Sequence, residues 1–310
     1  MRYVIDPGKE RRSINVVSDV CFSHVTDLEG KPLDLYMTLM LQNGNSAMRL
    51  ADGVDDEVST GKQPVIVWIN GAGWRGCDRM LMAAEMVFLA EAGYALAFID
   101  YRSSGQGHFP AQLVDCKTAV RFLRAHADQH GIDPDRIGTI GRSAGGHLSA
   151  WMAMNVDGYD SDEWGGYSSK VQAAVDMFGP VDLRKLNEIE AENIKNPNHR
   201  WHRLIDTHGG ALIGGEEDTI VARSDAASPI NFISDKMAPL TILHGDKDPA
   251  VPLFISEEFY DRLVKAGLEG RADLYVVKNG GHGTRELFQA QTKQVIRDAF
   301  DKYLMKGEGK

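Results

Sequence analysis

Residues 137–150 read IGTIGRSAGGHLSA, an apolar run followed by a serine set among glycines. The apolar residues predict a buried strand that ends near Ile140, and the small residues after Ser143 predict a helix lying close against a sheet. Glycines two positions before and two positions after Ser143 permit the strained turn on which a nucleophilic serine is exposed. Such turns also occur without catalysis. The stretch alone therefore leaves a nucleophile and a small turn residue equally open.

Strand and helix patterns alternate on both sides of this stretch. The alternation predicts right-handed crossovers and an α/β fold with a mainly parallel central sheet and helices on both faces. A β-hairpin precedes it. The expected strands are 13–22, 33–41, 64–70, 94–101, 136–140, 171–178, 240–245 and 272–277, and the other expected helices are near 78–92, 111–129, 254–267 and 284–304.

The alternation lapses between residues 179 and 228. A structureless loop of this length is unusual in a compact domain, so we expect a small helical lid insertion at about 180–228 over one end of the sheet. Residues 42–62 are polar and acidic, which indicates a solvated loop. With no linker or repeat in the sequence, we expect residues 1–310 to form a single domain.

Composition narrows the function. The chain has 310 residues and a formal net charge of −10, which argues against a general nucleic-acid partner because phosphate binding needs a basic face. No stretch is apolar enough for a signal peptide or a membrane span, so a cytoplasmic location without membrane attachment is expected. Cys21, Cys77 and Cys116 are widely spaced and are interpreted as free thiols, not as a disulfide or zinc site. No cofactor or metal is expected.

Two later segments supply possible partners for Ser143. The loop after strand 240–245 holds Asp246 and Asp248, and the loop after strand 272–277 holds His282 between glycines. The order serine, acid, histidine is that of a serine hydrolase with parallel strands, whose carboxyl ends meet at one edge. Asp248 is favoured as the acid because it lies nearer the loop tip, whereas Asp246 is typical of a turn residue.

Backbone amides that stabilise an oxyanion are expected from the residue after the nucleophile and from the loop after strand 64–70. That loop reads Asn70-Gly71-Ala72-Gly73-Trp74, and its small residues allow amides to approach a substrate oxygen. The predicted donors are Ala72, Gly73 and Ala144.

These motifs together resemble the α/β-hydrolase fold, and within it the esterases of the hormone-sensitive-lipase-like and acetylxylan/feruloyl esterase (BD-FAE-like) group. The resemblance covers most of the chain from about residue 14, and it implies Ser143 as nucleophile, Asp248 as acid and His282 as base. The loop of that group usually reads His-Gly-Gly-Gly, whereas this chain has Asn70 and Ala72 at two of those positions. A positive φ at Ala72 would be strained.

The resemblance implies a carboxylic ester hydrolase that acts through an acyl-enzyme on short-chain or aromatic acyl esters, with acetyl or feruloyl groups on hemicellulose sugars as candidates. Its partner would be a small-molecule or carbohydrate ester, and a homodimer is compatible with the sequence. One alternative is an aminopeptidase or acylpeptidase, although 310 residues leave no room for the additional large domain of such enzymes. A non-catalytic small-molecule binder is a further alternative, disfavoured because no triad member is missing.

Other polar and aromatic residues are given structural interpretations. The acidic stretch 157–163 lacks the ligand order of a calcium loop and is interpreted as a solvated loop. The spacing of His199, His202 and His208 matches no helix-borne zinc pair. His147 is interpreted as packed against the sheet, and His244 as a strand-end histidine bonded to backbone. The minority hypothesis for Trp201, Trp164, Tyr159 and Tyr167 is an aromatic acyl pocket.

Overall fold

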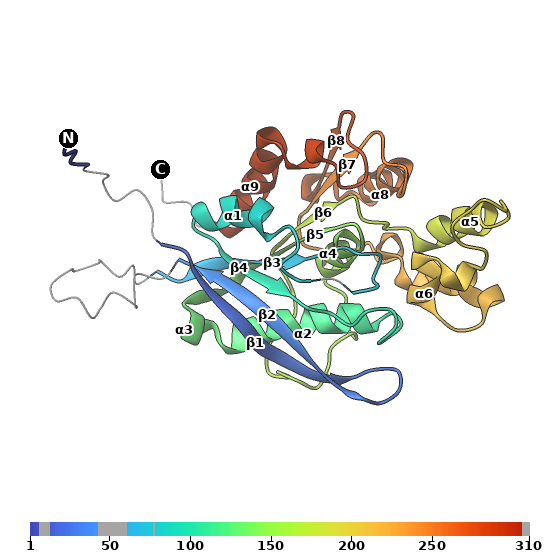
Figure 1. Ribbon diagram of the computed structural model, residues 1–310, viewed down its shortest axis with the longest axis horizontal. Helices are drawn as coiled ribbons and strands as arrows, with labels where there is room; N and C mark the ends of the chain where they lie inside the picture. Colours follow the sequence, from blue (N-terminus) through green and yellow to red (C-terminus); the bar gives the residue numbers. More distant parts are fainter. Residues whose placement is uncertain (6–12, 43–60, 77, 306–310) are drawn as a thin grey trace.

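The computed structural model describes residues 1–5, 13–42, 61–76 and 78–305 (Figure 1). Eight strands form one sheet in the order β1-β2-β4-β3-β5-β6-β7-β8. The β1–β2 and β2–β4 pairs are antiparallel and the other neighbouring pairs are parallel, which confirms the predicted hairpin and mainly parallel sheet. The strands are β1 Asn15–Thr26, β2 Pro32–Leu41, β3 Gln63–Ile69, β4 Ala95–Ile99, β5 Ile132–Arg142, β6 Ala173–Met177, β7 Leu240–Gly245 and β8 Ala272–Val277.

Helices cover both faces of the sheet. The α-helices are α1 Ala83–Glu91, α2 Ala111–Ala125, α3 Ala127–His130, α4 Ala144–Met154, α5 Leu183–Asn193, α6 His208–Ile213, α7 Ile220–Arg223, α8 Phe254–Lys265 and α9 Ala290–Leu304. One face packs against α2 and α4, and against α8 beyond them, while the other packs against α1 and α9. Figure 1 shows α1 and α9 together on one side of the strands, with α2 on the other.

Strand β3 shows why the sheet needs two helical layers. Val65, Val67 and Ile69 belong to the core on the α2 and α4 side, whereas Ile66 and Trp68 belong to the core on the α1 and α9 side. Successive side chains of a strand point to opposite faces, so an uninterrupted apolar run can only be satisfied by burial on both. All five of these side chains are at most 1% exposed.

Strand cores were predicted more accurately than element ends. The strands at 240–245 and 272–277 have the predicted bounds. The helix expected near 78–92 begins only at Ala83, because Met82 adopts a left-handed conformation with φ 67°. The strand expected at 136–140 begins earlier, at Ile132, where the chain pairs with Gln63 of β3. The loop expected at 42–62 lies almost entirely outside the described residues.

The segment between β6 and β7 folds into short helices, as predicted for an insertion. Asp182 accepts a hydrogen bond from the Lys185 amide at 2.9 Å and so caps α5, and the Thr207 hydroxyl accepts one from the Gly210 amide at 3.0 Å and caps α6. Side-chain caps of this kind satisfy amides that have no partner in the first turn of a helix. Figure 1 shows α5 and α6 grouped at one end of the molecule, beyond the strands.

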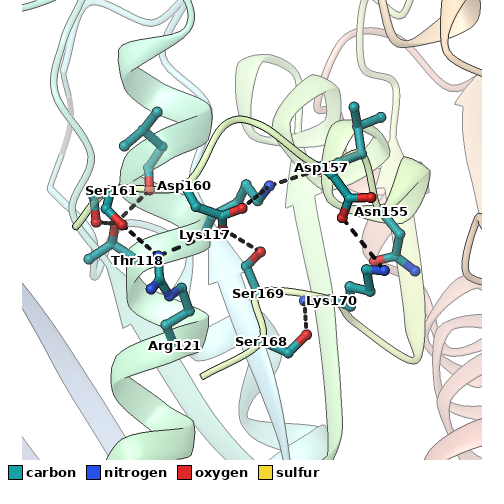
Figure 2. A network of polar contacts seen from close by, with 12 residues as sticks. Lys117, Thr118, Arg121, Asn155, Asp157, Asp160, Ser161, Ser168, Ser169 and Lys170 are labelled. Atoms are coloured by element: carbon teal, nitrogen blue, oxygen red, sulfur yellow. Dashed lines mark hydrogen bonds and ion pairs between the residues drawn. The ribbon is translucent and has the colours of Figure 1, made fainter. Parts of the chain in front are cut away.

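The loop from α4 to β6 is bound closely to α2 (Figure 2). The Lys117 ammonium donates to the Val156 carbonyl at 2.8 Å and to Asp160 at 3.1 Å, and Arg121 donates to the Ser161 carbonyl at 2.7 Å. The acidic stretch 157–163 is therefore not simply a solvated loop, because buried cations of α2 pair with part of it. That pairing joins segments about forty residues apart, which a local sequence pattern does not reveal.

Two smaller expectations concern membranes and thiols. Across the described part of the chain, no helix combines the length and the apolar character that crossing a membrane requires. Cys21 and Cys116 are free cysteines, the latter buried, whereas Cys77 lies outside the described residues.

Candidate active site

Ser143 lies on a sharp turn between β5 and α4. Its backbone has φ 52° and ψ −120°, a strained combination for a residue with a side chain, and its amide donates to the Met177 carbonyl of β6 at 2.8 Å. A β-carbon at Gly141 would collide with the Gly145 carbonyl, and one at Gly145 would collide with the Ile69 carbonyl. The two glycines are therefore required by close backbone contacts, and the turn presents Ser143 at the carboxyl edge of the sheet.

The structure brings Ser143, His282 and Asp248 together from three different loops. His282 Nε2 lies 2.9 Å from Ser143 Oγ, and His282 Nδ1 lies 2.8 Å from Asp248 Oδ2. Because the carboxylate only accepts, Nδ1 carries the proton and Nε2 is left to accept the hydroxyl proton of Ser143. This is the relative arrangement of a nucleophile, a base and the acid that orients the base.

Asp248 is held as a carboxylate. Its side chain is fully buried, which opposes ionisation, but contacts with His244 and His282 and the Val251 amide more than offset burial and lower its pKa below the usual range. The second oxygen accepts from the Ala250 and Val251 amides at 2.8 and 2.9 Å. An ionised, rigidly held carboxylate stabilises a positively charged imidazole.

The neighbouring titratable residues have structural roles. Asp246 accepts a hydrogen bond from the Asn279 amide at 2.6 Å, so it joins the loops after β7 and β8 and does not contact His282. His244 is buried, with Nε2 2.8 Å from the Val251 carbonyl and Nδ1 2.7 Å from Ser256 Oγ. His147 is also buried, but against Trp74 and the Ala227 carbonyl instead of the sheet, and burial lowers its pKa to about 4.

The loop after β3 lies directly against Ser143. A β-carbon placed on Gly71 would be 2.9 Å from the Ser143 β-carbon. The Gly71 amide is engaged by Asn70 Oδ1 at 2.9 Å, whereas no hydrogen bond within the described chain uses the amides of Ala72, Gly73 or Ala144. These three amides remain the predicted oxyanion donors.

The backbone strain of this loop lies at Trp74, not at Ala72, the position considered from the sequence. Ala72 does not have positive φ; Gly73 and Trp74 do, at 59° and 56°. The Arg75 amide donates to the Ala72 carbonyl at 3.1 Å, which closes a four-residue turn whose two central residues take the left-handed conformation. The strained non-glycine residue is thus Trp74, which is 2% exposed and held edge-on to His147.

Asn70 fixes this loop and is the residue whose role sequence analysis missed. It is fully buried, and its Oδ1 accepts from the Gly71 amide and from Arg142 Nε, each at 2.9 Å. Its Nδ2 donates to the Asp78 carbonyl at 3.0 Å. Two signals were present in the sequence. Asn70 departs from the His-Gly-Gly-Gly pattern, and it is a polar residue directly after a buried strand, where an amide can bond to backbone in both directions.

A cavity of roughly 350 Å³ opens over Ser143 and His282, within the size range of small-molecule sites. Residues of the insertion form much of its wall, including α5 and the start of α6. Trp201 lines the cavity, as the minority hypothesis suggested, whereas Trp164 contacts Phe122 and His126, and Tyr159 contacts Phe109 and Trp151. The lining residues are Gly73, Trp74, Ser143, Pro180, Leu186, Glu190, Asn193, His199, Arg200, Trp201, His208, Gly209, Pro249, Ala250, Val251 and His282.

One group of possible metal ligands lies away from the cavity, at the edge of the sheet. Cys21, His24 and Asp34 on the β1–β2 hairpin have ligand atoms within 4.8 Å of one another. His24 Nδ1 and Asp34 Oδ1 already contact each other at 2.7 Å. Three other strands separate the edge strand β1 from β5, so this group does not contribute to the Ser143 site.

Comparison with known proteins identifies the family of the chain. Residues 54–263 match the BD-FAE family model. The chain belongs to the BD-FAE family. A solved structure titled a truncated form of carbohydrate esterase from gut microbiota superposes on this BD-FAE protein with a TM-score of 0.72 and 26% identity, covering 97% of this chain and 99% of that one. Thermogutta terrifontis esterase 2 phosphorylated by paraoxon shares the fold, with a TM-score of 0.67 and 22% identity over 94% of this chain and 96% of that one. The fold of this BD-FAE protein is therefore the α/β-hydrolase fold.

Curated relatives of this BD-FAE protein are esterases by name. It is 31% identical to the probable carboxylic ester hydrolase LipM of Mycobacterium tuberculosis over 66% of its own length and 46% of that protein. It is 28% identical to the esterase LipC of the same organism over 76% of its length and 57% of that protein. The chain spans about half the length of the curated relatives it matches.

Proposed function

We propose that the protein is a carboxylic ester hydrolase that works through an acyl-enzyme on Ser143. The observation that carries this proposal is the continuous hydrogen-bonded series from Ser143 Oγ through His282 to Asp248, with contacts of 2.9 and 2.8 Å. Membership of the BD-FAE family and the esterase names of its relatives support it.

The reaction follows from the geometry. His282 Nε2 removes the hydroxyl proton as Ser143 Oγ attacks the ester carbonyl carbon, and Asp248 stabilises the imidazolium. The amides of Ala72, Gly73 and Ala144 are our proposed donors to the oxyanion of the tetrahedral intermediate. The intermediate then collapses, and the imidazolium gives its proton to the departing alcohol. Water attacks the acyl-enzyme by the same route, with His282 again as base, and releases the acid.

The substrate part of the proposal is an ester of a short-chain or aromatic acid with a small alcohol or sugar, with acetyl and feruloyl groups on hemicellulose sugars as the specific candidates. The cavity of roughly 350 Å³ suits groups of this size. The carbohydrate esterase title of a structural relative that this chain covers almost completely supports a sugar ester.

Hydrolysis of 4-nitrophenyl acetate and butyrate tests the activity. We expect turnover by the wild-type protein and a fall in kcat of about four to six orders of magnitude for Ser143→Ala, because the nucleophile is removed. Ser168→Ala is the matched control, since that serine lies on the loop between α4 and β6 and does not line the cavity. Equal rates for Ser143→Ala and wild type would refute the proposal.

Two further measurements separate the alternatives. A fluorophosphonate should label folded wild-type protein at Ser143 and leave Ser143→Ala unlabelled, which distinguishes a poor choice of ester from a site without reactivity. Acetylated xylan and methyl ferulate, compared at equal ester concentration, test the sugar and aromatic candidates. Activity on 4-nitrophenyl acetate without activity on either would remove hemicellulose esters from the proposal.

A further inference from the structure

Arginines are concentrated in and around one stretch of the insertion beside the cavity. The chain as a whole has a formal net charge of −10, yet the stretch 199–208 reads HRWHRLIDTH. Arg200 from this stretch lines the cavity that contains Ser143. Arg75, from the loop after β3, contacts the same stretch at Asp206, Thr207 and His208.

Trp201 holds two of these arginines. The guanidinium carbons of Arg200 and Arg75 lie 4.5 and 5.1 Å from the centre of a Trp201 ring. A guanidinium at this distance from an indole is attracted to the ring face. The indole therefore limits the positions of both charges without consuming their hydrogen-bond donors.

Arg75, Arg200 and Arg203 differ in how many of their hydrogen-bond donors already have partners. Arg75 donates to His208 Nδ1 at 3.1 Å and to two backbone carbonyls, and Arg203 pairs with Glu217 at 3.4 Å. Arg200 has no hydrogen bond or ion pair with any residue that the structure describes, and contacts Trp201 alone among aromatic rings there. Its planar set of donors is free to bind a group from solution.

Arg200 and Trp201 also line a second hollow. This hollow has a volume of roughly 290 Å³, and the residues that line it are Arg75, Arg200, Trp201, His202, Arg203, Ile205 and Asp206. Its lining residues include three arginines and one carboxylate, that of Asp206, and Arg203 also pairs with Glu217, which is outside the lining. Arg200 and Trp201 also line the cavity over Ser143, so the hollow lies beside that cavity.

The arginine charges affect the pKa of a histidine that lines the cavity. Burial chiefly, and then the charges of Arg75 and Arg200, lower the pKa of His208, which lines the Ser143 cavity. Glu190 is the acid on the cavity wall, and its carboxylate is 4.0 Å from His199 Nε2. Glu190 thus faces a histidine within the same wall, and Arg200 remains available.

We propose that the hollow lined by Arg75, Arg200 and Arg203 binds a carboxylate carried by the substrate, so that the preferred substrates are esters of acidic compounds. This inference rests on the proposed ester hydrolysis and specifies its substrate class. A guanidinium matches a carboxylate with two parallel N–H···O bonds, and Arg200 supplies the free guanidinium. The carboxylate would lie on a part of the ester distant from the reacting carbonyl, in the hollow beyond Trp201.

Matched pairs of esters test this inference. Mono-4-nitrophenyl adipate and its methyl ester differ by a carboxylate against a neutral methyl ester on the acyl side, and 4-acetoxybenzoate and its methyl ester differ in the same way on the alcohol side. Release of the phenol is followed in each case, so cleavage of the methyl ester is not counted. The quantity measured is the ratio of kcat/KM for the anionic ester to that for the neutral ester. Comparing this ratio between wild type and variants cancels the intrinsic reactivity of each ester.

We expect Arg200→Gln to lower the ratio by about tenfold or more in at least one pair, mainly through a higher KM for the anionic ester. Arg200→Lys should retain part of the preference, because it keeps the charge but not the paired donors. Hydrolysis of the neutral esters is the reference for each variant, so a general loss of activity cancels in the ratio. Arg262→Gln on α8, which pairs with Glu258 and lies outside both hollows, is the control.

The outcomes separate this inference from the proposed function. A pair that responds to Arg200→Gln supports the inference and identifies which half of the ester carries the carboxylate. Unchanged ratios in both pairs, with neutral esters still hydrolysed in a Ser143-dependent manner, overturn it and leave the esterase proposal standing. Failure of wild type to hydrolyse any of the four esters overturns both.

Discussion

Gly73 stands where the loop after β3 meets the insertion. Its φ of 59° is one that residues with side chains rarely adopt, and a β-carbon there would collide with the His208 imidazole. The Gly73 amide is also one of the proposed oxyanion donors. Any side chain at this position must move either the loop or His208, so the residue couples the geometry of the proposed oxyanion hole to that of the insertion.

Gly73→Ala should therefore lower kcat for 4-nitrophenyl acetate by about 10²- to 10³-fold, the effect of losing one oxyanion donor, with a smaller change in KM. Steady-state kinetics on protein with an unchanged circular dichroism spectrum measures this. Gly76→Ala is the control, because Gly76 also has positive φ, at 91°, but a β-carbon there would meet only Ser103 at 3.4 Å. Equal losses in both variants would show that backbone strain, not contact with His208, is responsible.

The three predicted residues that the structure brings together share one property: each stands on the turn or loop that follows a recognisable strand. Ser143, Asp248 and His282 follow β5, β7 and β8, and parallel strands carry such residues to a common edge. Asn70 also follows a strand, but its importance comes from bonds to Arg142 and Asp78, which no local pattern encodes. Arg200 escaped notice because a lone arginine in an irregular segment has no spacing to interpret.

At the scale of elements, buried charged side chains of α2 hold the irregular loop before β6 in place (Figure 2). Lys117 is 6% exposed, and its ammonium satisfies the Val156 carbonyl and Asp160 together. Asp160 also accepts from Ser169 Oγ at 2.7 Å. Removing the lysine would leave a carbonyl and a carboxylate without their shared donor, which is more costly than the loss of an exposed pair.

We expect Lys117→Met to lower the free energy of unfolding by about 1–3 kcal/mol, with hydrolysis of 4-nitrophenyl acetate unchanged at temperatures well below the unfolding transition. Urea denaturation followed by tryptophan fluorescence gives the free energy. Lys170→Met is the matched comparison, because Lys170 pairs with Asp157 at 3.6 Å with both side chains largely exposed, and should change stability by less than about 1 kcal/mol. A Lys117 variant as stable as the Lys170 variant would contradict the assignment.

Element ends were harder to predict than element centres, because an apolar pattern can continue past the end of a helix. Met80, Leu81 and Met82 continue the apolar pattern of α1, yet they form turns before the helix, with Met82 left-handed. The last helix likewise begins at Ala290, after a 3₁₀ turn at Arg285–Phe288, and not near residue 284. Hydrophobic periodicity does not distinguish a turn from a helix: Met80 and Met82 are partly buried in the turn, and Leu81 is exposed although it is apolar.

For the whole molecule, the sheet and the insertion contribute different parts of the site. The sheet sets the distances among the proposed catalytic residues, which lie on short loops at its carboxyl edge. The insertion contributes much of the cavity wall and all but one of the arginines proposed to bind a carboxylate. Related chains with the same sheet can thus keep one chemistry and change substrates through this segment. Substrate class is correspondingly the property least readable from motifs.

Asp176 of β6 links the whole fold to pH. It is fully buried beneath α4, its Oδ1 accepts from the Gly179 amide at 2.8 Å, and its Oδ2 has no partner among the described residues. Burial raises the pKa of Asp176 to about 6, although the Gly179 amide and the charge of His244 oppose the rise. The folded protein therefore binds a proton here more tightly than the unfolded chain, whose value is near 3.8.

The sign of the pH effect follows from that difference. A raised pKa contributes stability that is fully present below about pH 4 and is lost as the pH rises through about 6. The whole contribution is about 3 kcal/mol, and roughly half of it is lost between about pH 5 and pH 8. Asp176→Asn cannot ionise, so its stability relative to wild type should increase by about 1–2 kcal/mol over that interval. Urea unfolding of both proteins at several pH values measures the difference, in which the other titrating groups cancel. If the stabilities of the two proteins change in parallel from pH 5 to pH 8, Asp176 is ionised throughout this interval. That result would contradict the assignment, because a buried carboxylate with one unpartnered oxygen should resist ionisation.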